Sequence, residues 1–258
     1  MAAFLFFQLA GPMASWGGIA VGEDRGSAPH PSRSAVLGIL ASALGIRRRE
    51  EDRLRTLAQA CRVAVVVVDP GSFLRDYHTT QVPSCTDAKG WPLRTRRDEL
   101  DLVAWLRPNK GKAGEAILSN RDYRCDGQWI IGIQAASSDP VFSLDAFRRA
   151  LLEPQLCLFL GRKACSPSLP LAPQIIEAET LVDGLGRIRF GKIGEVAASR
   201  RLGTGPRSIG LYWEPGMDVG FEPRETVERR DDPLSRQRWQ FRPRLEHHAP
   251  LPEGVMPC

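Results

Sequence analysis

The hydrophobic pattern opens with a run of apolar residues over Phe4–Leu9 (FLFFQL). A nearly continuous apolar run of this length predicts a central strand that is covered on both faces. Gly11-Pro12 ends the strand, and a glycine-rich loop follows it. Ser32 then stands at an N-cap position, and apolar residues at helical spacing continue to Gly45. The sequence therefore predicts a strand, an open loop and a helix in this order.

Three further apolar runs predict strands, at Cys61–Val68 (CRVAVVVV), Gln128–Ala135 (QWIIGIQA) and Leu156–Leu160 (LCLFL). Helices are predicted over Glu50–Gln59 and Val141–Leu152. The order strand, helix, strand, strand, helix, strand is the split βαβ pattern of the ferredoxin-like fold. We therefore expect an α+β protein with a ferredoxin-like (RRM-like) domain over residues 1–166.

The residues between Pro70 and Gly127 form an insertion that the ferredoxin-like pattern does not need. Within it, Lys89–Lys112 holds seven Lys or Arg against three acidic residues, and Trp91 and Trp105 stand among them. Insertions of this length in a compact domain are usually functional or disordered. Rings that stack bases and cations that meet phosphates favour a nucleic-acid-facing arm, and a solvated surface excursion is the alternative. We predict an inserted basic arm at about 70–127.

From Pro167 the chain changes to short segments rich in Pro and Gly. Candidate strands are Arg187–Phe190, Ile209–Glu214 and Arg238–Arg242, so residues 167–242 are predicted to form a smaller β-rich region. Residues 243–258 hold four prolines and little apolar material. They are predicted to form a flexible tail.

Charge and cysteine content restrict the class of protein further. The net charge is +5, and 30 of the 35 cations are Arg, which suits bidentate phosphate binding. Codon usage in a GC-rich genome explains the Arg excess equally well. The six cysteines form no CxxC pair and only four histidines are present, which argues against structural zinc. No apolar run reaches the ~18 residues of a membrane span, and no export signal is evident, so we expect a cytoplasmic protein.

Arg33 lies in the first turn of the first predicted helix, where the helix dipole disfavours a cation by about 0.3–1 kcal/mol. A bound anion would reverse the sign, because free backbone N–H groups and the guanidinium would both face it. A solvated Arg tolerated at small cost is the alternative. The basic pairs Arg162-Lys163 and Arg200-Arg201 fall at loop starts and are further candidate phosphate contacts.

The segment Leu74–Gln81 (LRDYHTTQ) gathers the densest set of reactive side chains. A Tyr beside a His could support metal-independent RNA cleavage, with a general base activating a 2′-hydroxyl. Neighbours in an extended segment point in opposite directions, however, and Tyr and His also stack bases. Binding is therefore favoured over catalysis at this segment, and both interpretations remain open.

Several segments together resemble the CasD family, the RNA-handle-binding subunits of the type I-E CRISPR Cascade complex within the RAMP superfamily. They occur in the family's order across the first two-thirds of the chain. The matching segments are Leu9–Gly17 (LAGPMASWG), Pro31–Ile46 (PSRSAVLGILASALGI), Leu74–Thr79 (LRDYHT), Leu118–Trp129 (LSNRDYRCDGQW) and Leu152–Leu171 (LEPQLCLFLGRKACSPSLPL). The region beyond Pro173 resembles the family only loosely, although Arg229–Ser235 (RRDDPLS) is compatible.

This resemblance implies a non-catalytic subunit that grips the 5′ repeat-derived handle of the CRISPR RNA. It implies an inserted thumb that reaches the neighbouring backbone subunit, contact with the large subunit, and indirect contact with target DNA through the complex. No cofactor, metal or membrane is implied. In the related type I-C branch the equivalent protein cuts RNA with Tyr, Lys and His, so Tyr77, His78 and Lys89 keep a metal-independent endoribonuclease as the alternative.

The resemblance and the local patterns together give the expected binding residues. No catalytic residue is expected. The expected RNA-binding residues are Trp16, His30, Arg33, Ser34, Arg75, Tyr77, His78, Arg162 and Lys163, and the expected thumb residues, facing RNA or a neighbouring subunit, are Trp91, Arg94, Arg96 and Arg97.

Overall fold

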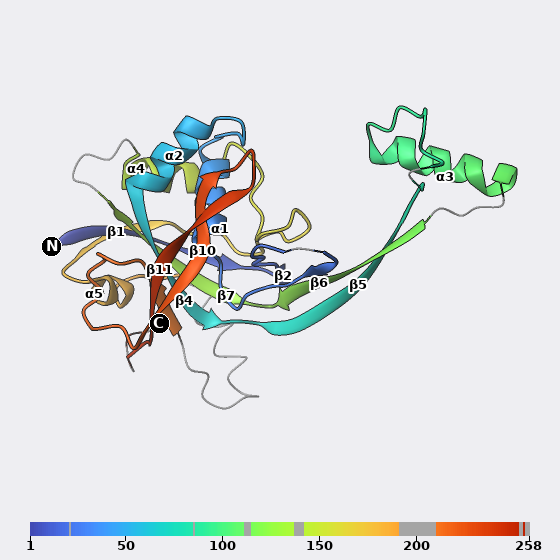
Figure 1. Ribbon diagram of the computed structural model, residues 1–258. Coiled ribbons are helices and arrows are strands. Elements are labelled where there is room, and N and C mark those ends of the chain that lie inside the picture. The colour runs from blue at the N-terminus through green and yellow to red at the C-terminus, as the bar shows by residue number, and fades with distance from the viewer. Residues whose placement is uncertain are drawn as a thin grey trace. The chain divides into compact units, whose positions relative to one another are not determined.

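The chain forms two compact units in a computed structural model, which describes residues 1–20, 22–84, 86–110, 115–136, 142–190, 210–252 and 255 (Figure 1). The first unit comprises Met1–Ile19, Ser27–Leu74 and Tyr123–Cys258. The second comprises Ala20–Gly26 and Arg75–Asp122. The chain therefore leaves the first unit and returns to it twice.

The first unit is built on an antiparallel sheet whose strands, within the described residues, follow the order β10-β11-β9-β4-β7-β1-β8. The long apolar runs mark its centre, because strands buried on both faces need no polar alternation. The strands predicted at Phe4–Leu9, Cys61–Val68 and Gln128–Ala135 are confirmed. The bounds are β1 Ala2–Ala10, β4 Cys61–Asp69, β7 Gln128–Ala135, β8 Gln174–Ala178, β9 Gly210–Trp213, β10 Glu225–Ser235 and β11 Gln240–Pro250.

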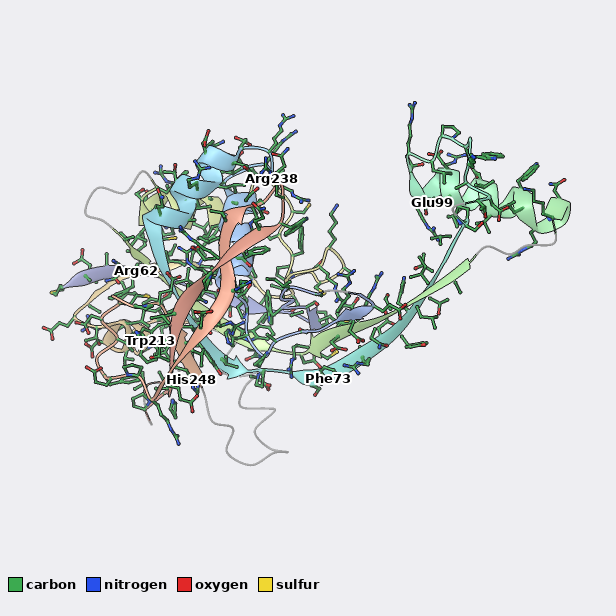
Figure 2. The ribbon with its side chains drawn as sticks, in the orientation of Figure 1. Arg62, Phe73, Glu99, Trp213, Arg238 and His248 are labelled. Atoms are coloured by element: carbon green, nitrogen blue, oxygen red, sulfur yellow. The ribbon has the colours of Figure 1, made fainter. Side chains whose placement is uncertain are left out.

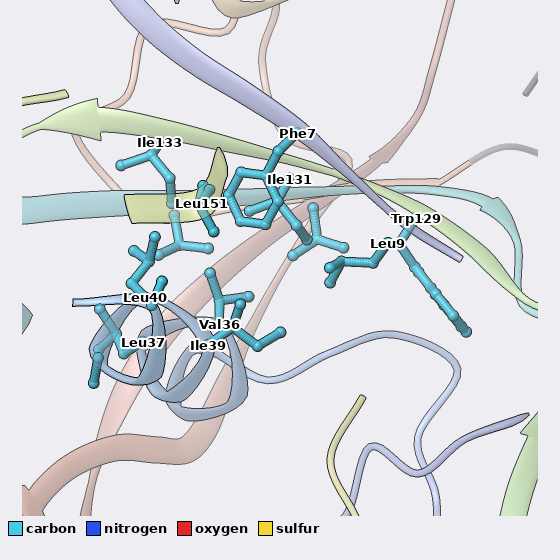
Figure 3. Packing of buried hydrophobic residues seen from close by; sticks show 14 of the residues in the cluster. Phe7, Leu9, Val36, Leu37, Ile39, Leu40, Trp129, Ile131, Ile133 and Leu151 are labelled. Atoms are coloured by element: carbon cyan, nitrogen blue, oxygen red, sulfur yellow. The ribbon is translucent and has the colours of Figure 1, made fainter. Parts of the chain in front are cut away.

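Helices α1 (Arg33–Ala43), α2 (Glu51–Ala60) and α4 (Leu144–Leu152) supply the apolar side chains on one face of this sheet. Figure 3 shows Val36 and Leu40 of α1 pointing toward the strands that carry Phe7 and Ile131. The other face is covered by a second apolar cluster that includes α5 (Leu181–Leu185). The first unit is thus a mixed α/β structure with helices on both faces of an antiparallel sheet.

Ser32 caps α1, as the sequence predicts, and its Oγ accepts a hydrogen bond from the backbone N–H of Ala35 at 3.2 Å. The predicted helix at Glu50–Gln59 appears as α2. The helix predicted at Val141–Leu152 appears as α4, and Val141 itself lies outside the described residues.

The strand predicted at Leu156–Leu160 is wrong, because this segment has no strand structure. Its backbone is committed elsewhere: the Leu156 N–H donates to Ser42 O at the end of α1, and Leu160 O accepts from the Ser15 N–H. The place beside β1 is taken by β8, whose Ile176 lies opposite Phe4. A short apolar run does not reveal which hydrogen-bond partners its backbone will find.

The C-terminal part also differs from the prediction. Arg187–Phe190 forms no strand. The strand predicted at Ile209–Glu214 appears as β9 over Gly210–Trp213, while Glu214 follows it without strand structure and Ile209 lies outside the described residues. The tail predicted to be flexible from residue 243 is corrected up to Pro250, because these residues belong to β11, which pairs with β10 on one side and β9 on the other. His247 and His248 contribute to this pairing, so the prolines bound a strand instead of preventing one.

The second unit contains most of the insertion predicted between Pro70 and Gly127. Its elements are β3 (Asp24–Arg25), α3 (Arg96–Lys110) and the outer parts of β5 (Ser72–Val82) and β6 (Glu115–Cys125). β6 pairs with β5 and with β3, and near its end it pairs with β2 (Met13–Ala14) of the first unit. Leu102, Val103 and Leu106 of α3 are buried. The basic segment Lys89–Lys110 therefore has folded structure of its own, while Lys112 lies outside the described residues.

Candidate nucleic-acid interface

Two guanidinium groups lie over aromatic rings where β5 and β6 join the first unit. The Arg162 Cζ lies 4.6 Å from the centre of the Tyr123 ring, and the Arg124 Cζ lies 5.6 Å from the centre of the Phe73 ring. Phe73 is 54 % exposed and is labelled in Figure 2. We call these four residues, with the exposed Lys163, the cation–ring site. Stacked guanidinium groups of this kind can hold a phosphate and an unpaired base together.

Backbone contacts fix the loop that carries Arg162 and Lys163. The Ser15 N–H donates to Leu160 O at 2.9 Å, and the Leu160 N–H donates to Cys165 O at 2.7 Å. Gly161 has φ +90°, and a Cβ at this position would meet Ser15 O at 1.8 Å. Only glycine permits this close approach, so the loop after Leu160 packs directly against the backbone of Ser15, the residue that follows β2.

Arg124 has an unmet hydrogen-bonding group. Its Nη2 donates to Ser27 O at 3.4 Å, whereas its buried Nε has no partner among the described residues. Buried polar groups are nearly always paired, and an unpaired N–H on a cation favours an oxygen ligand. Arg124 and Phe73 therefore offer positive charge, an N–H donor and a ring on one face of β6, and Arg162 and Lys163 offer cations beside Tyr123 on the other face.

Trp16 is buried and does not reach the surface. Its ring packs edge-on against Trp129 at 5.1 Å and an angle of 90°, and the Trp129 Nε1–H donates to Pro29 O at 2.8 Å. The Trp16 Nε1 has no partner among the described residues. Trp16 thus supports the glycine-rich loop from within, and direct stacking on RNA would require its side chain to be uncovered.

Arg33 is 7 % exposed and contacts carboxylates, which corrects the expectation of an open phosphate site at the start of α1. Its Nε donates to Glu214 at 2.8 Å and its Nη1 to Asp232 at 2.5 Å. Its backbone N–H donates to Asp231 at 2.8 Å. The helix dipole favours an anion at this position, and the protein supplies it as the carboxylate of Asp231, 198 residues further along the chain.

The carboxylates around Arg33 form a buried network with the arginines of β10 and β11. Asp231 accepts from Arg244 at 2.6 Å, and Arg244 also donates to Glu246. Burial raises the pKa of Asp231, but the hydrogen bonds and charge of Arg244 outweigh burial and lower it. Burial raises the pKa of Glu214, and the charge of Arg33 opposes that change.

His30 also belongs to this network and is buried. Its Nε2 accepts from Arg229 at 2.7 Å and its Nδ1–H donates to Pro31 O at 3.1 Å. Burial lowers the pKa of His30 to about 4, although Glu246 opposes the change, so the ring is neutral at physiological pH. Ser34 is half-buried, and its carbonyl accepts from Arg236. Neither His30 nor Ser34 presents an open phosphate site.

The second unit holds Arg75, Tyr77 and His78 on β5. Arg75 makes a two-pronged contact with Asp122, at 2.8 and 3.0 Å, and these bonds raise its pKa. Tyr77 is exposed, and His78 Nδ1 lies 3.7 Å from Asp76. Consecutive residues of a strand point to opposite faces, so Tyr77 and His78 do not converge.

The predicted thumb residues lie on and before α3. Trp91 packs against Trp105 with ring centres 5.7 Å apart, and Lys110 lies 5.9 Å from the Trp105 ring. Arg96 pairs with Glu99 and Arg97 with Asp101, and both arginines are exposed. Arg94 is exposed, and its backbone N–H donates to Asp98. Two half-exposed tryptophans among cations thus form one surface of this unit.

Sequence reasoning missed Phe73, Tyr123 and Arg124, although two of them stand in the quoted segment Leu118–Trp129. The signal available was the pair Tyr123-Arg124 next to a glycine turn, but the partner rings and cations come from other segments. Arg200 and Arg201 lie outside the described residues. Within the part of the chain that is described, no three His, Cys, Asp or Glu side chains gather as a metal site, and no helix is long and apolar enough to cross a membrane.

Comparisons with known proteins identify relatives over most of the chain. The family model described as CRISPR-associated protein (Cas_Cas5) matches residues 4–245. The "CRISPR system Cascade subunit CasD" of Escherichia coli (strain K12) is 28% identical over 179 residues, which is 66% of this chain and 70% of that protein.

Solved structures share the fold. A chain of a "CRISPR RNA-guided surveillance complex" matches with a TM-score of 0.59 and 24% identity, covering 96% of this chain and 90% of that one. A structure entitled "Crystal structure of Cas protein" matches with a TM-score of 0.57 and 24% identity, covering 98% of this chain and 97% of that one.

Proposed function

The chain belongs to the Cas5 family of CRISPR-associated proteins, and we propose that it is the Cascade subunit that holds the 5′ repeat-derived handle of the CRISPR RNA. The relative from E. coli bears the name of a Cascade subunit. The observation that carries the proposal is the cation–ring site, with its two guanidinium groups over rings and an Arg124 Nε that has no partner among the described residues.

Unpaired RNA is the ligand that suits this site. Proteins recognise single-stranded RNA by stacking bases on rings or guanidinium planes and by meeting phosphates with cations. In this proposal Phe73 carries the stacking, and Arg124, Arg162 and Lys163 contact phosphates. Tyr123 is buried, and its ring holds the Arg162 guanidinium in place. The rigid contact between Gly161 and Ser15 keeps these groups in position before RNA binds.

We also propose that the domain that carries this site is ferredoxin-like. The strand order β4-β7-β1-β8, with α1 after β1 and α4 after β7, supports this assignment. In this reading the fourth strand is β8 and the domain extends past residue 166 to Ala178, while β9, β10 and β11 extend the sheet beside β4.

In the same proposal the second unit is the thumb, which contacts the RNA or the neighbouring backbone subunit. Its exposed rings and cations support this role, with Trp91, Arg94, Arg96 and Arg97 as contact residues. Arg75, Tyr77 and His78 on β5 would line the RNA near the base of the thumb. The large subunit would dock on the first unit, and target DNA would be reached through the complex. The subunit is non-catalytic in this proposal and acts in the cytoplasm.

The experiment that tests the proposal measures the binding of repeat RNA, which has the sequence of the repeat in the CRISPR array next to the gene. The variant carrying Arg162→Gln and Lys163→Gln should bind this RNA at least about tenfold more weakly, because two charge-assisted contacts are lost. The slope of log affinity against log salt concentration should become shallower by about 1.4, because each lost phosphate contact on a single strand removes about 0.7 from it. In purified assemblies the 5′ end of the RNA should be protected from nuclease.

The matched control carries Arg148→Gln and Arg149→Gln on α4. Both arginines pair with Asp145 on a helix away from the cation–ring site, and the change in net charge is the same. This control should bind repeat RNA as the wild type does. Recovery of random cellular RNA alone, or an equal loss of affinity in the control, would contradict handle binding at this site.

A further inference from the structure

A second basic surface lies where the loop between α1 and α2 meets the turn between β10 and β11. The Arg48 Nε donates to Arg236 O at 2.6 Å and its Nη2 donates to Gln237 O at 3.2 Å. These bonds join segments 188 residues apart. Figure 2 shows Arg238, in this turn, well separated from Phe73 of the cation–ring site. We call Arg47, Arg48, Arg49, Arg236, Arg238 and Trp239 the arginine patch.

The patch holds five arginines, and the carboxylates of Glu50 and Glu51 lie near Arg49 and Arg238. Arg236 is half-buried, and within the described residues it donates to Ser34 O without a carboxylate partner. Burial and the nearby charge of Arg48 lower its pKa to about 10. Arginines held together in this way repel one another, and an anion would relieve the repulsion.

The two acidic residues beside the patch are already engaged. Glu50 accepts from the Arg47 backbone N–H and from Arg53, both at 2.7 Å. Glu51 accepts from the Ser235 hydroxyl at 2.5 Å and from the Gln237 backbone N–H at 3.0 Å. These carboxylates stabilise the loop and the turn, so the exposed guanidinium groups of Arg47, Arg49 and Arg238 remain available to solvent.

Trp239 occupies a backbone conformation that favours glycine or asparagine. Its φ is +53°, in the left-handed region, at the end of the turn between Ser235 and Gln240. Trp239 is 58 % exposed, so core packing does not explain the choice of residue. The Arg48 Cζ lies 4.3 Å from the ring centre and holds the ring on the patch. The turn thus presents a large ring to solvent at a position that disfavours it.

From these observations we propose that the arginine patch binds a segment of single-stranded nucleic acid other than the repeat handle. Its phosphates meet Arg47, Arg49 and Arg238, and one unpaired base stacks on the Trp239 ring. Arg recognises phosphate with two parallel N–H groups and also stacks on bases, which suits a polynucleotide. A protein interface would instead need an apolar centre with few charges, whereas this patch holds five arginines around Trp239, with the Phe241 ring 6.2 Å from the Trp239 ring. This inference goes beyond handle binding and uses different residues.

The test measures the anisotropy of labelled mixed-sequence single-stranded RNA and DNA with the full chain, in the presence of saturating unlabelled repeat RNA. The variant carrying Arg49→Gln and Arg238→Gln should bind the label at least about tenfold more weakly and lower the salt slope by about 1.4. Trp239→Asn should weaken binding by about tenfold and leave the salt slope unchanged, because a stacking contact carries no counterions. Asn suits the positive φ, so the turn should stay folded.

The control carries Arg187→Gln and Arg189→Gln, which remove two exposed arginines next to α5 and should leave the affinity unchanged. The RNA and DNA arms tell which strand is preferred. Equal affinity of the patch variants and the wild type for the labelled oligonucleotide would overturn the inference. It would also be overturned if the patch variants bound the oligonucleotide normally but lost neighbouring subunits from purified assemblies, because the patch would then be a subunit interface. If repeat RNA binds normally in these cases, handle binding stands and only the second site fails.

Discussion

His30 lies at the end of a stack of three rings. It faces Tyr212 with ring centres 3.9 Å apart at 24°, and Tyr212 faces His248 at 4.4 Å and 23°. The Arg229 guanidinium donates to His30 Nε2, and Glu246 lies 3.6 Å from the same atom. Asp231 is the other nearby charge. A proton on Nε2 would displace the Arg229 bond, so the packed structure requires the neutral ring.

The buried neutral His30 predicts a specific dependence of stability on pH. Its pKa falls from the ordinary 6.5 to about 4 in the folded protein, so between these values the unfolded chain binds the proton and the folded chain does not. The free energy of unfolding should therefore fall as pH drops from 6.5 toward 4. At about 1.36 kcal/mol per pKa unit the loss reaches about 3 kcal/mol. Urea unfolding measured across this pH range checks it.

The variant His30→Gln separates this residue from the carboxylates that titrate in the same range. Gln can accept from Arg229 and donate to Pro31 O, but it has no proton to gain. The variant should be less stable at pH 7 and should lose less stability on acidification than the wild type. Parallel stability curves for the two proteins would show that His30 does not carry the pH dependence.

At the scale of elements, Arg33 connects four parts of the first unit. It belongs to α1 and reaches Glu214 after β9, Asp232 in β10 and the carbonyl of Ala58 in α2. The hairpin β10–β11 is held to the helical layer through these bonds and through the contact between Arg236 and Ser34. The N-terminus of α1 is therefore positioned by the C-terminal strands, and the loop before it depends on them indirectly.

Arg33→Ala should destabilise the protein by about 3–5 kcal/mol, because removal of one partner leaves carboxylates buried without a counter-charge. Arg53→Ala should change stability by at most about 1 kcal/mol, since Arg53 is exposed and pairs with Glu50 on the surface. Chemical denaturation of both variants measures the difference. Handle RNA binding by folded Arg33→Ala protein should resemble that of the wild type. Equal stabilities of the two variants would contradict the structural role.

Hydrophobic pattern predicted the elements that are decided locally. β1, β4 and β7 are long apolar runs, and such runs are typical of central strands that are buried on both faces. Ser32 caps α1 by a hydrogen bond to Ala35, only three residues away. The choice between Leu156–Leu160 and β8 was not local, because it depends on which backbone groups α1 and Ser15 occupy. β11 was missed in part because its prolines conceal a strand that is paired on both sides.

In the candidate site, the sequence likewise identified residues that stand in local motifs and missed those that depend on long-range partners. Arg162 and Lys163 follow a recognisable glycine turn, so the sequence identifies them. Arg33 looks identical in sequence to a phosphate ligand, and only the arrival of Asp231 and Asp232 from 198 and 199 residues away gives it another role. Phe73 and Arg124 come from different strands and meet only in the folded chain. Long-range partners thus limited the prediction at every point where it failed.

At the scale of the whole molecule, scaffold and nuclease make opposite predictions about RNA. Metal-independent cleavage needs an acid and a base that converge on one phosphate. Tyr77 is 65 % exposed on β5, and His78 points to the other face of the strand beside Asp76. We therefore expect the full chain to leave repeat RNA intact, with or without a chelator, on a denaturing gel. His78→Ala should leave this result unchanged and reduce handle affinity at most, whereas a single specific cut that disappears in His78→Ala would establish the nuclease.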